Sequence, residues 1–83
     1  MEIITSFSFA DNRLSRLTFH EGITHIEQGA FYYNELSSIS FPKSLKEIQE
    51  LAFKNNPQLR RVEIFQGTKV SDDAFDEQVE IVW

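Results

Sequence analysis

The sequence has no cysteine, and its 83 residues include only three glycines and two prolines. Without cysteine the fold can have neither a disulfide nor a thiolate metal site. The Gly-rich phosphate loop, the two-cysteine knuckle and the Gly-x-Ser-x-Gly elbow are all missing. No apolar run approaches the roughly 18 residues of a membrane-spanning helix. These absences exclude the most recognisable enzyme and membrane classes.

Basic residues are also scarce, since 8 lysines and arginines stand against 13 acidic residues for a formal net charge of −5. An acidic chain is a poor non-specific ligand for nucleic acid or for an anionic membrane. The residues from Met1 to Phe7 lack the basic region and long apolar stretch of a secretion signal. We expect no nucleic-acid partner and no membrane insertion, and a chain that is either cytosolic or a piece of something larger.

A repeat of 22 residues is the strongest pattern in the chain. Ala-Phe pairs recur at this interval, and Phe9 lies one interval before the first of them. Their positions are Ala30-Phe31, Ala52-Phe53 and Ala74-Phe75. An aliphatic residue stands five places before each Phe, at Ile4, Ile26, Ile48 and Val70. An asparagine stands three places after the first three, at Asn12, Asn34 and Asn56. This agreement predicts a stack of similar units with a shared core.

The repeat predicts a solenoid of short parallel strands, at roughly 16–19, 38–41, 61–64 and 79–82, joined by compact turns or short helical return segments. One inserted residue near Pro57 shifts the third strand. The four Phe residues of the repeat are expected to form one buried column, and each asparagine to bond backbone groups where the chain turns. Residues 1–83 are expected to form a single domain of about three and a half repeats, either complete or cut from a longer array.

Three elements of the middle repeat carry a family resemblance. They are Ile-x-x-x-Ala-Phe ending at Phe31, Leu-x-x-Ile-x-Phe-Pro from Leu36 to Pro42, and Leu-x-x-Ile from Leu45 to Ile48. This pattern resembles the BspA-type leucine-rich repeat family over nearly the whole chain. The resemblance implies a leucine-rich-repeat solenoid, with adhesion or recognition at a bacterial or protozoan surface. Family members are usually long and often carry secretion or anchoring signals, so a secreted or cell-surface location is implied only for a longer parent.

Two groups of residues invite a metal-binding interpretation. His20, Glu21 and His25 straddle a turn, but their spacing does not imply convergence, and two solvated histidines explain them better. The acids Asp72, Asp73, Asp76 and Glu77 lack the alternating ligands and Gly turn of an EF-hand loop, and a short helical turn capped by Ser71 explains them better. We expect no metal, no cofactor and no catalytic residue. A small metal-dependent enzyme using the two histidines is a much weaker alternative.

The outward-facing strand positions are the best candidate binding surface, because stacked strands align them in columns. The expected columns are Arg16, Ser38, Arg61 and Gln78; Thr18, Ser40, Glu63 and Glu80; and His20, Pro42, Phe65 and Val82. Tyr32 and Tyr33 form a second aromatic patch, and aromatic residues are favoured at interfaces. For Phe65 and Val82, packing on each other and on Trp83 is an equally good explanation.

We therefore expect a non-enzymatic module that binds a protein through its strand face. The alternative is a structural spacer or end-cap of a longer array, with no partner of its own. A half-repeat at the start leaves Phe7 and Phe9 poorly covered, and the last strand offers an unpaired edge with Trp83. Self-association through one or both ends, in isologous pairs or head to tail, is the further expectation.

Overall fold

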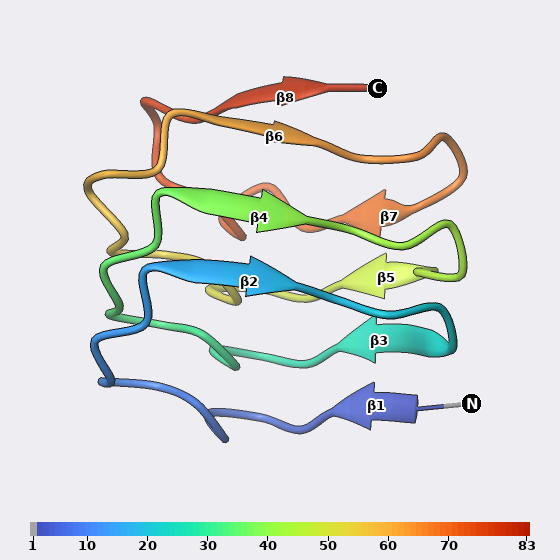
Figure 1. Ribbon diagram of the computed structural model, residues 1–83, viewed down its shortest axis with the longest axis horizontal. Coiled ribbons are helices and arrows are strands. Elements are labelled where there is room, and N and C mark those ends of the chain that lie inside the picture. The colour runs from blue at the N-terminus through green and yellow to red at the C-terminus, as the bar shows by residue number, and fades with distance from the viewer. Residues whose placement is uncertain (1) are drawn as a thin grey trace.

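The computed structural model describes residues 2–83, which wind through about four turns of a β-solenoid (Figure 1). Each turn contributes one short strand to each of two layers. The back layer contains β1 (Glu2–Ile4), β3 (Ile23–Ile26), β5 (Glu47–Ile48) and β7 (Lys69–Val70). The front layer contains β2 (Arg16–Thr18), β4 (Ser38–Ser40), β6 (Arg61–Glu63) and β8 (Glu80–Val82). The strands of the two layers run in opposite directions (Figure 1).

All strand pairs are parallel, but only the back layer is continuous. Its sheet has the order β1-β3-β5-β7, and its register aligns Ile4, Ile26, Ile48 and Val70 in one column. The front layer consists of two separate pairs, β2 with β4 and β6 with β8. The four predicted front strands are thus present and parallel, while the back strands were not anticipated and the expected pairing of β4 with β6 does not occur.

The aromatic column of the repeat runs through the core. Adjacent rings are stacked, with centroids 5.3 Å apart for Phe9–Phe31 and Phe31–Phe53 and 5.2 Å apart for Phe53–Phe75. Phe31, Phe53 and Phe75 are buried, as predicted, because stacked turns cover both faces of each ring. Phe9 belongs to the same column but is 44% exposed, since no described turn lies on its outer side.

Buried asparagines tie each turn to the preceding one, as the sequence predicted. The Asn34 and Asn56 side-chain oxygens accept hydrogen bonds from the backbone N–H of Leu14 and Leu36, both at 3.1 Å. Their amide nitrogens donate to backbone carbonyls of their own turn and of the turn before, at Phe9, Phe31 and Phe53. A buried amide that satisfies donors and acceptors on two turns replaces backbone pairing where the chain changes direction.

The expected helical return segments are wrong, since residues 2–83 contain no helix. The return segments instead begin as the back-layer strands and continue as turns, and the first three contain two positive-φ residues each. The first set of equivalent positions is Phe7, Gly29 and Leu51, and the second is Asp11, Tyr33 and Asn55. A residue with positive φ interrupts a right-handed helix, so two of them leave no helical turn to form in these three segments.

Candidate binding groove

The exposed face of the front layer carries six of the predicted binding residues. They occupy the outward strand positions and are all exposed, and they are Arg16, Thr18, Ser38, Ser40, Arg61 and Glu63. The residues between them, Leu17, Ile39 and Val62, turn inward toward the core. This alternation is the period-two pattern of a strand with one buried face, so the strands hold these polar groups at defined positions.

The columns expected on this face are wrong at the last strand. β8 pairs with β6 so that Glu80 lies beside Arg61 and Val82 beside Glu63, a shift of two residues from the expected register. The expected register placed Gln78 beside Arg61, so the link from Phe75 to β8 is two residues longer than expected, although it is still shorter than the corresponding links in the earlier turns. Gln78 lies in this link, where its Nε2 donates to the Leu59 carbonyl at 3.1 Å. The expected third column also fails, because Pro42 is buried and does not face outward.

A groove of about 830 Å³ lies where β4 and β6 face each other without pairing. We attribute the interruption to the residue inserted near Pro57, because Leu59 follows Leu36 by 23 positions and not by 22. The inserted residue lies in the link before β6 and changes where that strand begins relative to β4. The residues lining the groove are Ser37, Ser38, Ile39, Ser40, Phe41, Arg61, Glu63, Ile64, Phe65, Gln66, Val82 and Trp83.

The groove combines exposed aromatic rings with charges that form no ion pair within residues 2–83. Phe65 is 43% exposed and Trp83 is 56% exposed, so neither ring is covered by the other. The Lys43 Nζ lies 5.7 Å from the centroid of the Phe65 ring, within reach of a cation–π contact. Among residues 2–83 no ion pair involves Arg61 or Glu63. Both charges are therefore free to meet complementary groups on a partner.

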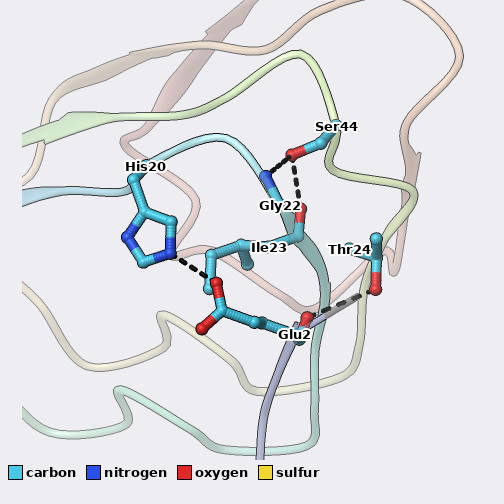
Figure 2. A network of polar contacts seen from close by, with 6 residues as sticks. All are labelled: Glu2, His20, Gly22, Ile23, Thr24 and Ser44. Carbon is cyan, nitrogen blue, oxygen red and sulfur yellow. Dashed lines mark hydrogen bonds and ion pairs between the residues drawn. The ribbon is translucent and has the colours of Figure 1, made fainter.

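His20 lies outside the groove, in the turn between β2 and β3, where it forms an ion pair with Glu2 of β1 (Figure 2). Beside it, the Ser44 hydroxyl accepts from the Gly22 N–H at 2.9 Å and donates to the Ile23 carbonyl at 2.8 Å (Figure 2). These bonds link three successive turns of the solenoid at one corner. His20 thus has a visible structural contact, while the predicted residues of β2, Arg16 and Thr18, lie outside the groove lining.

The two tyrosines form a separate surface. Tyr33 is 58% exposed and borders a second hollow of about 560 Å³, which it shares with Lys54 and Asn55 among others. The Tyr32 hydroxyl accepts a hydrogen bond from Asn55 Nδ2 at 3.1 Å, and its ring packs edge-on against Tyr33 with centroids 5.8 Å apart. The structure therefore brings five of the ten predicted residues into one groove and places the tyrosines elsewhere.

The metal-binding candidates have other contacts. His25 Nδ1 lies 2.9 Å from the Thr24 hydroxyl, and the part of the chain from residue 2 onward contains no group of three or more His, Asp or Glu side chains placed to hold a metal ion. The same residues include no helix long and apolar enough to cross a membrane.

Sequence reasoning missed the groove itself, together with Ser37 and Gln66 in its lining. The residue inserted near Pro57 is the sequence feature that could have indicated the groove. An inserted residue can, however, lengthen a loop without any effect on strand pairing. Only the strand pairing of the structure shows that β4 and β6 lie in separate sheets.

Two layers of short parallel strands with a 22-residue turn define a β-solenoid repeat protein. The sequence profile of the BspA type leucine rich repeat region, in six copies, matches residues 1–82, and the chain therefore belongs to this family. The resemblance drawn from the Ala-Phe and leucine motifs is confirmed. No curated protein and no solved structure matches the chain. Solenoids of this family are typically non-enzymatic and often bind proteins or mediate adhesion.

Proposed function

We propose that this protein is a non-enzymatic binding module that holds an extended segment of a partner protein in the groove between β4 and β6. The observation that carries the proposal is the groove of about 830 Å³ with Phe65 and Trp83 exposed along it. Exposed aromatic rings beside unpaired charges are the composition of interface anchors. The continuous back sheet supports the groove from behind, so little ordering of the binding site is needed on association.

Polar groups along the same groove suit the backbone of an extended segment. Ser38 and Ser40 present hydroxyls on one side, and Arg61 and Glu63 present opposite charges on the other. The hydroxyls can donate to or accept from peptide groups, while the two charges select side chains of the partner. The aromatic end contributes most of the affinity and the polar end most of the specificity.

The test is a selection of binders from a library of displayed random peptides, followed by affinity measurements on the recovered peptides. Phe65→Ser is expected to weaken their binding by about tenfold or more, as truncation of an anchor does. Tyr33→Ser is the matched control, because it removes a similarly exposed aromatic ring from the other hollow. Equal losses for the two variants would contradict the proposal. Failure to recover any binder would instead favour the structural-spacer alternative.

A further inference from the structure

Aromatic pairs connect successive turns of the solenoid in a repeated geometry. The residue directly after a front strand packs edge-on against the Phe of the next return segment. Phe19 meets Phe31 and Phe41 meets Phe53, both with ring centroids 5.5 Å apart. Both pairs are separated by 12 residues, since 31 − 19 and 53 − 41 are equal. Each such pair needs one ring from an earlier turn and one from the following turn.

The two ends of the described chain each hold one half of this pair. Trp83 directly follows β8, as Phe19 follows β2 and Phe41 follows β4, and it is 56% exposed. Phe9 is the return-segment ring of the first turn, and it is 44% exposed. Within residues 2–83, no return segment packs against Trp83 and no front-layer ring precedes Phe9. The two exposed rings are therefore complementary in a geometry that the chain already uses twice.

Charge at the two free edges of the front layer is complementary as well. β2 and β8 are the outer strands of their pairs, and their outer edges are unpaired within residues 2–83. Arg16 lies beside Ser38 in one strand pair, and Glu80 lies beside Arg61 in the other. Ser38 and Arg61 occupy equivalent repeat positions, two residues after Leu36 and Leu59, so the repeat places Arg16 and Glu80 in the same outward column. If β8 of one molecule lay beside β2 of another, Glu80 would stand next to Arg16. Opposite charges on neighbouring strands stabilise pairing.

We propose that the ends bind a second copy of this chain head to tail, with β8 of one copy beside β2 of the next and Trp83 against Phe9. A two-fold pairing of the N-terminal ends would place Arg16 of one molecule near Arg16 of the other and would leave Trp83 exposed. Phe75 is only 7% exposed, so Trp83 of the front layer, and not Phe75, supplies the ring that meets Phe9 of the next copy. The proposal shares Trp83 with the peptide groove, but neither Arg16 nor Glu80 lines the groove, so reversing these two charges tests association separately from peptide binding.

The size of the end surface predicts a weak association. The solenoid stacks along the vertical direction of Figure 1, so its cross-section is bounded by the 27 Å and 21 Å extents. Such an end buries on the order of 1,000 Å² from both copies, the lower limit for a specific interface. Because a head-to-tail contact leaves a free end on each assembly, mass should grow past the dimer and not stop there.

Analytical ultracentrifugation of the full chain, from about 10 µM to about 1 mM, tests this. The weight-average mass should rise continuously with concentration past that of a dimer. Arg16→Glu and Glu80→Arg should each weaken association by roughly tenfold, since each replaces an attraction between copies with a repulsion. The double variant Arg16→Glu/Glu80→Arg should restore association. The melting temperature of Glu80→Arg is measured as well, because the new arginine would also lie beside Arg61 of its own chain. Lys46→Glu is the matched control, because it reverses a charge at an exposed position away from both end strands.

Three outcomes would overturn the proposal. They are a mass that stays monomeric over the whole series, a mass that levels off at the dimer, and a double charge reversal that fails to restore what the single reversals lose. Trp83→Ser adds a second line of evidence, because this exposed residue at the end of the chain is not required for the packed core. It should weaken association while the melting temperature stays within a few degrees of the parent, a shift of the size expected for an exposed position.

Discussion

Replacing Asn56 with alanine should destabilise the fold severely, although it removes only a few side-chain atoms. Asn56 is fully buried and has two irreplaceable bonds, from the Leu36 N–H to its Oδ1 at 3.1 Å and from its Nδ2 to the Phe53 carbonyl at 2.9 Å. Its other acceptors, the carbonyls of Phe31 and Lys54, each keep a second donor. Two buried polar groups are thus left without a partner, at about 1–3 kcal/mol each. We expect a loss of about 4 kcal/mol in the free energy of unfolding.

Urea denaturation followed by circular dichroism measures this loss directly. The same position in the first turn provides the control, because Asn12 is exposed and its Nδ2 bonds only nearby carbonyls of its own turn. Asn12→Ala should therefore change stability by less than about 0.5 kcal/mol. For a domain of this size the difference corresponds to more than about 10 °C in melting temperature. Equal effects of the two variants would refute the assignment of the asparagines as links between turns.

Three further predictions follow from the packing and the turns. Phe53→Ala should cost about 3–5 kcal/mol in thermal or urea unfolding, because the ring is fully buried between two stacked rings; a cost below about 1 kcal/mol would contradict the stacked core. Gly29→Ala should cost about 2–3 kcal/mol, since Gly29 has φ 63° and a Cβ there would lie 2.3 Å from the Phe7 ring. In a chain that already contains Phe7→Ala, the loss of stability caused by Gly29→Ala should fall to about 1 kcal/mol. Equal losses with and without the Phe7 ring would show that contact with this ring is not the cause. Glu2→Gln should leave the melting temperature nearly unchanged, because an ion pair this exposed contributes little; a shift above about 5 °C would show that β1 depends on His20.

The repeat positions could be predicted from sequence because stacking places equivalent residues in contact. A 22-residue period therefore predicts the buried Phe31 and Phe53 and the roles of Asn34 and Asn56 without any knowledge of the path between them. The front strands followed from alternation of apolar and polar residues. In each case the same contact recurs in every turn, so several repeats predict it and a departure from the pattern at one position does not change the prediction.

The return segments could not be predicted in the same way. Their shape depends on residues with positive φ, and Gly29, Asp11 and Asn55 are of types that favour this region. Phe7, Tyr33 and Leu51 are not, and nothing local distinguishes these three from helical residues. The candidate site had a similar limit: the outward residues of single strands were predictable, but which of them share a groove depends on how the insertion near Pro57 is absorbed.

The asparagine links have a consequence for where the chain could be shortened. The partner of the Leu14 N–H is 20 residues further along the chain, and the same holds for Leu36 and Asn56. A fragment ending at a repeat boundary before Asn56 would keep the second front strand but lose the group that satisfies its first buried amide. The smallest fragment that satisfies its own buried backbone groups is therefore longer than one 22-residue repeat. When the third turn opens, the Leu36 N–H in the second turn loses its hydrogen-bond acceptor on Asn56. Hydrogen exchange should show the Leu36 amide reporting on the opening of residues around Asn56, so that the turns lose protection together and not one repeat at a time.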